Sequence, residues 1–310
     1  MEPIASVHNP RIRQLVALRD RRERARTGRI LVDGAREIRR ALESETVVEQ
    51  LVACAALCAG EECRSALALA TSRGIPRLDV TDRVFEKLAY GDRADGLVAV
   101  ARPPSTELAR LRLPPEPLVV VVVSVEKPGN LGAILRSADG AGADALIVAD
   151  PATDLFNANA IRASLGTIFS VPLAAASTSD VVAWLTAHRL RVVTARVDAQ
   201  ALYTDADLRG GIGLVLGSEA EGLTAAWDGP GFEPVRLPML GVADSLNVSV
   251  TAAVLLYEAR RQRGAPNREA ADGGVPTRGV PNRGPAAGRA EIANDAYHSM
   301  TKRRGRSTKG

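Results

Sequence analysis

Three short clusters between residues 126 and 249 combine polar and small residues in a way that could perform chemistry. The first, 126–136, reads EKPGNLGAILR and contains Asn130 and Arg136. The second, 217–223, reads GSEAEGL, and the third joins LPM at 237–239 to ADSLNVS at 243–249. The first two clusters follow apolar runs of strand length, so we expect their side chains at the ends of buried strands.

The first cluster places one arginine inside an apolar helical segment. Arg136 has Leu, Ala and Ile neighbours, and a guanidinium beside buried positions needs an anionic partner, either a carboxylate or a phosphate. Asn130 stands at the expected helix start, where it can cap the orphan amides or serve a reaction. The loop lacks the G-x-G-x-x-G fingerprint, and the chain has no G-K-[ST] motif, which disfavours a standard Rossmann enzyme and nucleotide hydrolysis.

The other two clusters have both structural and functional interpretations. Gly217 allows the backbone to turn closely past a ligand, and Glu219 lies near an expected helix start that favours its charge. Ser245 can cap the last helix, with Asn247 and Ser249 in its first turn. Each residue alone fits a turn or a cap, but two glycines and two carboxylates in one tight segment favour a site.

These clusters belong to an alternation of strands and helices. Apolar runs at 118–125, 145–149, 171–174, 191–195, 212–216 and 235–237 predict strands, and the segments 131–141, 159–169, 179–188 and 245–263 predict helices, with a further short helix after Glu219. This order predicts an α/β fold with a parallel sheet covered by helices on both faces. We expect five segments: a basic arm (1–28), a small α/β domain (29–101), a Pro-rich linker (102–117), the main domain (118–263) and a disordered basic tail (264–310).

Composition and charge exclude several classes of protein. Aromatic residues make up 3% of the chain, which argues against a row of exposed aromatics for base stacking. No apolar run has membrane-spanning length, three scattered histidines argue against a metal site, and the odd cysteine count predicts free thiols in a cytoplasmic protein. Residues 1–30 and 264–310 each carry a net charge of +5, so the total of +4 leaves −6 for the body between them. Two basic ends suit a polyanionic partner met through flexible arms.

Together, the three clusters resemble the three motifs of the SpoU (SPOUT-type) RNA 2′-O-ribose methyltransferases. The resemblance covers about 118–263, and 162–169 (RASLGTIF) resembles the segment between the first two motifs. Residues 29–101 resemble the family's substrate-binding domain less closely, with Asp33-Gly34 where Glu-Gly is usual. The resemblance implies a C-terminal trefoil knot, an exception to the rule that chains do not thread loops, and a homodimer with sites near its interface.

The resemblance also implies the site and its cofactor. It assigns catalysis to Asn130, Arg136, Glu219, Ser245 and Asn247, and binding of the methyl donor S-adenosylmethionine to Leu216, Gly217, Leu237, Met239 and Leu246, with no metal. Because a guanidinium keeps its proton at neutral pH, we expect Arg136 to clamp a phosphate and stabilise the developing alkoxide rather than to act as a base.

The substrate is less closely defined than the chemistry. We expect an RNA partner, with 23S ribosomal RNA favoured over transfer RNA because the chain joins a substrate domain to the main domain. Two alternatives stay open: a non-catalytic RNA-binding assembly factor of the same fold, and a related enzyme that methylates a base nitrogen. The spacing from Asn130 to Arg136 and the Ser245-Leu-Asn247 motif favour ribose.

Overall fold

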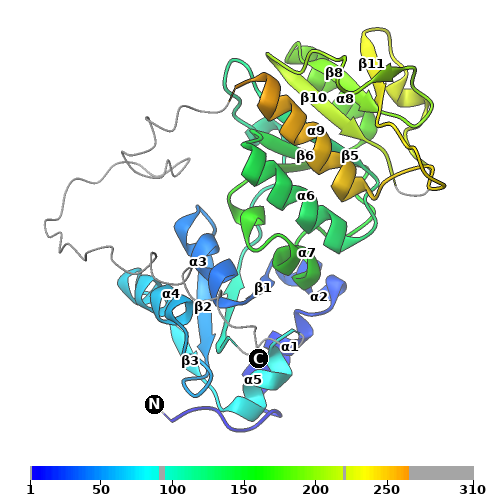
Figure 1. Ribbon diagram of the computed structural model, residues 1–310. Helices are drawn as coiled ribbons and strands as arrows, with labels where there is room; N and C mark the ends of the chain where they lie inside the picture. Colours follow the sequence, from blue (N-terminus) through cyan, green and yellow to red (C-terminus); the bar gives the residue numbers. More distant parts are fainter. Residues whose placement is uncertain (1, 91–94, 219–220, 265–310) are drawn as a thin grey trace, which may run out of the picture. The chain divides into compact units, whose positions relative to one another are not determined.

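The fold is described from a computed structural model, which covers residues 2–90, 95–218 and 221–264. Two separate sheets organise these residues (Figure 1). The expected tail from 265 onward lies outside the described residues. In the part of the chain that the structure covers, no helix is both long and apolar enough to cross a membrane.

The first sheet has four strands in the order β1-β4-β2-β3, with β4 antiparallel to both of its neighbours. Its strands are β1 (Ile30–Asp33), β2 (Val48–Ala53), β3 (Arg77–Asp79) and β4 (Leu97–Ala101). Its helices are α1 (Pro10–Ala17), α2 (Arg21–Thr27), α3 (Ala35–Glu43), α4 (Glu61–Ser72) and α5 (Asp82–Leu88). Strand β3 was not expected, because its three residues are too short to show a periodic pattern.

The N-terminal segment, expected as a flexible basic arm, is folded onto this sheet. Helix α1 buries Ile12 and Leu15 against α5, and Ile4 forms a bridge to Val80. Asn9 caps α1 by accepting a hydrogen bond from the backbone of Arg11. Apolar residues spaced along one helix face therefore outweigh the local arginine content.

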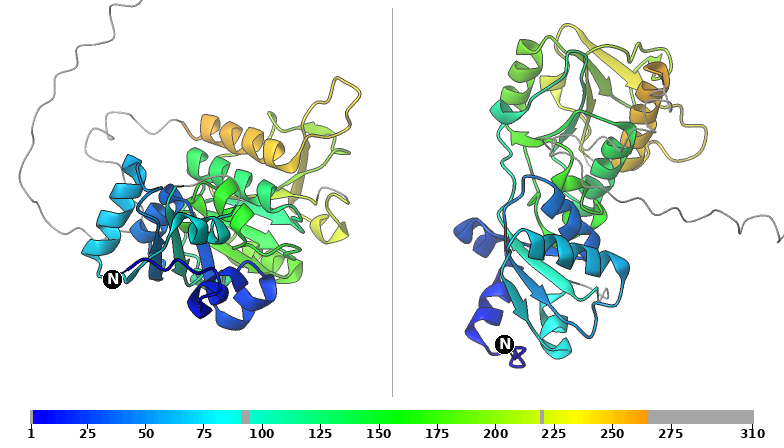
Figure 2. Two further views of the ribbon diagram at one scale, coloured as in Figure 1. Left: turned by 90° about the horizontal axis from the view of Figure 1, so that it is seen from below. Right: turned by 90° about the vertical axis from the view of Figure 1, so that its left-hand side faces the viewer.

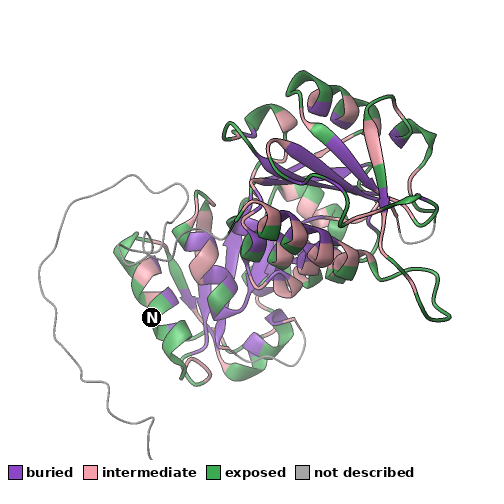
Figure 3. Cartoon of the chain, turned by 45° about the horizontal axis from the view of Figure 1, so that its top comes forward, coloured by how far each residue is buried: buried purple, intermediate pink, exposed green. Residues whose placement is uncertain are grey.

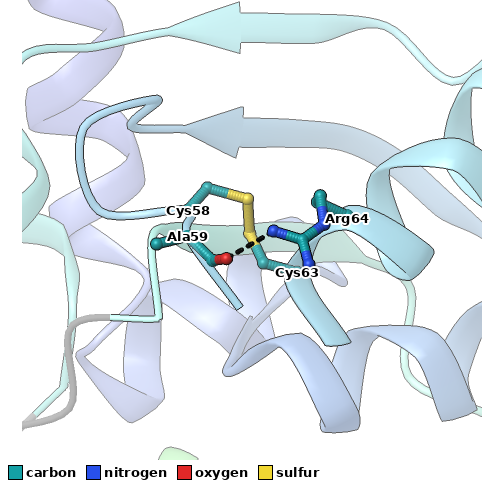
Figure 4. Close-up of a disulfide and its surroundings, with 4 residues drawn as sticks. All are labelled: Cys58, Ala59, Cys63 and Arg64. Atoms are coloured by element: carbon teal, nitrogen blue, oxygen red, sulfur yellow. Dashed lines mark hydrogen bonds between the residues drawn. A yellow bond between two sulfur atoms is a disulfide. The ribbon is translucent and has the colours of Figure 1, made fainter. Parts of the chain in front are cut away.

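Two of the three cysteines form a disulfide, so the expectation of free thiols is wrong for them. Cys58, in the turn before α4, is bonded to Cys63 in the first turn of that helix, with Cα atoms 5.6 Å apart (Figure 4). The Arg64 side chain closes the same turn by donating to the Ala59 carbonyl at 2.6 Å. Cys54 is free and buried.

The second sheet has seven parallel strands in the order β7-β6-β5-β10-β8-β11-β9. These are β5 (Leu118–Val123), β6 (Ala145–Ala149), β7 (Leu173–Ala176), β8 (Arg191–Ala195), β9 (Ala201–Leu202), β10 (Ile212–Leu216) and β11 (Phe232–Arg236). The central strands β5, β6 and β10 are buried along their whole length (Figure 3). Burial on both faces explains their unbroken apolar sequences and confirms the predicted α/β class.

Helices cover both faces of this sheet. They are α6 (Pro128–Ala141), α7 (Ala158–Ala163), α8 (Thr178–Ala187) and α9 (Val248–Gln262), with 3₁₀ turns at Leu108–Arg110, Thr167–Phe169 and Ala225–Trp227. One face packs on α6 and α9, which lie side by side in Figures 1 and 2, and the other packs on α8. The single helix expected over 159–169 is interrupted because Leu165 and Gly166 adopt left-handed conformations, with φ of 52° and 83°.

Candidate active site

The three clusters emerge from one edge of the seven-stranded sheet. Strands β5 and β10 are direct neighbours, and all strands of this sheet run parallel, so the loops that follow β5, β10 and β11 leave from the same edge. After β5, the chain first adds β6 and β7 on one side of that strand and then places β8, β9, β10 and β11 on its other side. The boundary between β5 and β10 is therefore the point at which the strand order switches direction. Such a switch point at the carboxyl ends of strands is where open α/β sheets bind ligands. Ser124, with φ of 48°, turns the chain away immediately after β5.

Helix α6 carries the first cluster, and it begins earlier than predicted. Pro128 occupies its first turn, where a missing amide hydrogen is tolerated, and Lys127 is the N-cap residue. Asn130 is therefore inside the helix, and of the two roles that the sequence left open for it, capping is excluded. Its side chain instead meets the third cluster, because its Oδ1 accepts a hydrogen bond from Nδ2 of Asn247 at 3.3 Å.

Arg136 lies on the exposed face of α6, opposite the positions that enter the core. No ion pair joins it to another residue within the described ranges, so the structural salt bridge left open by the sequence is not found there. Arg136 follows Gly129 by seven positions, and this spacing places both residues on one helix face, two turns apart. Helical side chains tilt toward the N-terminus, so the guanidinium extends back toward the loop after β5.

Asn247, and not Ser245, caps the last helix. Its Oδ1 accepts hydrogen bonds from the backbone N–H of Ser249 at 2.9 Å and from the Ser249 hydroxyl at 2.7 Å. The helix therefore starts at Val248, three residues later than predicted, and Ser245 lies exposed in the preceding loop. One amide thus fixes the start of α9 with its oxygen and contacts Asn130 with its nitrogen.

The second cluster forms a tight backbone turn after β10. Ser218 and Gly222 exchange backbone hydrogen bonds at 3.1 and 3.2 Å, and a Cβ added to Gly217 would lie 2.6 Å from the carbonyl oxygen of Gly222. Only glycine fits this position, as the sequence suggested. Glu219 lies outside the described residues, so its predicted role stays a prediction. The helix expected after it is the 3₁₀ turn Ala225–Trp227.

The residues predicted to bind the methyl donor lie at the end of β10 and in the loop after β11. Leu216 is buried, Gly217, Leu237 and Met239 are half-buried, and Leu246 is exposed. The narrow turn at Gly217 and the apolar side chains of the loop after β11 suit a ligand with an adenine ring and a thioether-like chain. Within the described residues, no group of three or more His, Cys, Asp or Glu side chains could hold a metal ion.

A second helix beside α6 adds residues that the sequence interpretation left without a role. Helix α7 packs closely on α6 at Gly132, where an added Cβ would lie 2.5 Å from that of Ala163. Gly129, Asn159, Arg162 and Ala163 line an open hollow of about 430 Å³ next to the first cluster. Arg162 belongs to the segment 162–169, which resembles the family sequence between the first two motifs. Its position beside Gly129 could not be predicted from that resemblance, because it depends on the packing of α7 against α6.

Arg162 also faces a buried carboxylate from the first sheet. Its Nη1 lies 3.7 Å from Oδ2 of Asp33, which is only 6% exposed at the end of β1. Burial raises the pKa of Asp33 to about 6, although the Tyr90 amide and Arg162 both lower it. In the sequence, Asp33 stands out only as a departure from the usual Glu-Gly pair, with no predicted role.

Solved structures share the fold over most of the chain. An RNA 2′-O ribose methyltransferase is 44% identical, with 84% of this chain and 99% of that chain covered and a TM-score of 0.75. An rRNA methyltransferase from Sinorhizobium meliloti, solved with bound AdoMet, is 28% identical, with 84% and 97% covered and a TM-score of 0.76. The fold and its loops therefore define an α/β methyltransferase of the SPOUT type.

Sequence comparisons define the family within that class. Residues 117–257 match the SpoU rRNA Methylase family, and residues 9–99 match the MRM3-like substrate binding domain. The 23S rRNA (uridine(2479)-2′-O)-methyltransferase of Streptomyces viridochromogenes is 33% identical over 265 residues, which cover 82% of this chain and 91% of the relative. The chain belongs to the SpoU rRNA methylase family.

Proposed function

We propose that the chain methylates a ribose 2′-hydroxyl of 23S ribosomal RNA, with S-adenosylmethionine as the methyl donor. The observation that carries the proposal is the hydrogen bond between Asn130 and Asn247, because it joins the third cluster to α6, the helix that also carries Arg136. The rRNA methyltransferase with bound AdoMet and the relative named for uridine 2479 of 23S rRNA support the donor and the substrate.

The reaction requires alignment more than a strong acid or base. The donor supplies a methyl group on a sulfonium; the ribose 2′ oxygen attacks this carbon in line, the carbon–sulfur bond breaks, and the hydroxyl proton is released. The exposed guanidinium of Arg136 can bind the phosphate next to the target ribose through two parallel hydrogen bonds. In that position its charge stabilises the negative charge that develops on the 2′ oxygen.

The other predicted residues divide between orientation and donor binding. Asn130 and Asn247 hold each other beside this face, and the capping bonds of Asn247 fix its amide. Leu216, Gly217, Leu237, Met239 and Leu246 would hold the donor at the neighbouring edge. Ser245, in the loop before α9, and Glu219, in the second sequence cluster, complete the proposed set.

Two further features are proposed with this activity: a homodimer in the cytoplasm and a trefoil knot. Large apolar side chains are exposed along the loop before α9 and on that helix: Leu240, Val242, Leu246, Val250 and Tyr257. Such a patch suits a protein interface, and light scattering of the purified chain should give twice the monomer mass. The insertion of β10 between β5 and β8 supports a chain path like that of the family.

A labelling experiment tests the activity. The chain is incubated with donor carrying a labelled methyl group and total RNA, and the modified nucleotide is mapped in 23S and transfer RNA. Label on a ribose of 23S RNA is expected. Label on a base, or in transfer RNA alone, would contradict the proposed substrate, and an inability to bind the donor in calorimetry would contradict catalysis.

The role of Arg136 is tested by Arg136→Lys, with Arg112→Lys as the control because Arg112 is an exposed arginine elsewhere in the same half of the chain. Loss of one transition-state hydrogen bond in a preorganised site lowers turnover by about 10²–10³-fold. We expect such a loss for Arg136→Lys and none for the control. Near-normal turnover with unchanged RNA binding would exclude the planar clamp.

A further inference from the structure

A small cavity lies between α2, β1 and α7, away from the donor-binding loops. Its volume is about 140 Å³, close to the ~150 Å³ of an engineered cavity that takes up benzene, so it suits one aromatic ring. Leu18, Leu31, Leu88 and Phe156 supply apolar walls. The polar or charged lining residues are Arg19, Arg24, Asp33, Tyr90, Asn157 and Asn159.

Asp33 provides the buried polar group of the cavity. Its Oδ2 accepts the Tyr90 amide hydrogen at 2.5 Å and faces Arg162, whereas its Oδ1 accepts no hydrogen bond from any residue that the structure describes. The side chain belongs to a residue that is more than nine-tenths buried, and it lines the cavity. Oδ1 is thus an acceptor at the cavity wall that an N–H donor of a ligand can reach, while Tyr90 and Arg162 hold Oδ2.

The rim of the cavity is aromatic and cationic. The guanidinium of Arg19 lies over the Tyr90 ring, 5.6 Å from its centre, and donates a hydrogen bond to the Ala89 carbonyl. Arg24 fixes the adjoining wall by pairing with Asp154 and donating to the Leu18 carbonyl at 2.9 Å. Unpaired bases are bound by stacking on such aromatic and guanidinium planes, together with hydrogen bonds to their edges.

The cavity also adjoins the hollow beside the first cluster. Asn159 lines both spaces, and its neighbour Arg162 faces Asp33 on one side and the hollow on the other. Within the described residues, Arg162 has no ion-pair partner besides Asp33, so its remaining N–H groups can bind an anion in the hollow. A phosphate bound there would lie between the cavity and Gly129 of α6.

We propose that this cavity holds an unpaired cytosine of the substrate RNA, with the neighbouring phosphate on Arg162. Cytosine combines a single ring with an exocyclic amino donor, which Asp33 Oδ1 can accept; uracil lacks the amino group, and purines have a second ring. The inference rests on the proposed function, since it takes RNA as the substrate. It adds a base-reading site outside the three motif clusters.

Fluorescence anisotropy with short labelled RNA tests the inference on the full chain. The probes are a uridine octamer and the same octamer with one central cytosine or one central adenine. A hydrogen bond to a charged group contributes enough for about a tenfold preference, so the cytosine probe should bind about tenfold more tightly than the uridine octamer. Equal binding of the three probes, or no binding of any, would overturn the proposal.

Two variants separate base reading from phosphate binding. Asp33→Asn presents an amide N–H₂ where Oδ1 was, so the cytosine preference should be lost while binding of the uridine octamer is kept. Arg162→Gln should weaken all three probes alike and reduce the salt dependence of binding. Glu61→Gln removes an exposed carboxylate from α4 and should change neither property. A cytosine preference retained by Asp33→Asn would refute the assignment.

Folding and activity measurements keep the outcomes distinct. Thermal unfolding of each variant shows whether a loss of binding comes from a loss of structure, and Asn159→Ala, an exposed change at the same cavity, provides a second test of binding. Labelling of ribosomal RNA is measured on the same preparations. If the normal chain methylates RNA but shows no base preference, only the cavity assignment fails; if it does not methylate RNA, the proposed function fails.

Discussion

Replacement of Asp33 by asparagine should stabilise the protein at neutral pH. The carboxylate at the end of β1 is buried, and its pKa is raised from 3.8 to about 6, chiefly by desolvation. Each pKa unit corresponds to about 1.4 kcal/mol, so the ionised form reduces the free energy of unfolding by roughly 3 kcal/mol. Asparagine carries no charge and has nearly the same shape, so it removes this penalty.

The sign of the pH dependence follows from proton binding. Between about pH 4 and pH 6 the folded protein holds a proton on Asp33 that the unfolded chain has released, so this residue's contribution to stability falls as the pH rises through that range. The Asp33→Asn variant lacks this fall. The difference between the two proteins should therefore be small near pH 4, grow through pH 6 and reach its full value above pH 7.

Urea unfolding at several pH values measures this difference. Both proteins are unfolded with the same buffers and salt, and the Glu61→Gln variant serves as the control for loss of an exposed carboxylate. A gain of 2–3 kcal/mol at pH 8 is expected by the same desolvation argument. A variant that is less stable than the normal protein at pH 8, or a difference that does not change with pH, would show that burial does not govern the pKa of Asp33.

The remaining predictions concern three glycines. Gly132→Ala should destabilise the protein by about 1–3 kcal/mol, because the new methyl group would lie 2.5 Å from the Cβ of Ala163; Gly129→Ala, with no atom near its Cβ, should change stability by less than about 1 kcal/mol in the same unfolding assay. Gly217→Ala should weaken donor binding by about tenfold or more in calorimetry, since its methyl group would lie 2.6 Å from the Gly222 carbonyl oxygen. Unchanged affinity would place the donor away from this turn.

Much of the fold could be predicted because the buried strands have unambiguous sequences. The runs at 145–149, 191–195 and 212–216 match β6, β8 and β10 to the residue. Strands β6 and β10 are buried along their whole length and therefore lack polar side chains, and β8 is recognised by its buried centre although it begins at the exposed Arg191. Helix ends were predicted less well. Pro128 signals the first turn of α6 but stands in a loop-like Lys-Pro-Gly sequence, and the choice between Ser245 and Asn247 as cap depends on hydrogen bonds that spacing does not determine.

The candidate site could also be predicted only in part: the residue types were recognised, but their contacts were not. The residue types at Asn130, Arg136 and Gly217 were recognised from the motifs, whereas the contact between Asn130 and Asn247 joins positions 117 residues apart and arises from packing of α6 on α9. The cavity at Asp33 was not predicted at all. Its carboxylate accepts the Tyr90 amide and faces Arg162 of α7, and neither the burial nor the raised pKa can be deduced from an isolated Asp-Gly pair.

The hydrogen bond between Asn247 and Asn130 has a consequence for the biosynthesis of this protein. A ribosome makes the chain from its N-terminus, so α6 leaves the exit tunnel more than a hundred residues before Asn247 does. Asn130 gains its bond from Asn247 only when the start of α9 has been synthesised and docked. Nascent chains that end before residue 247 would thus lack methyl-transfer activity, and competence would arise late, as one of the last events of synthesis.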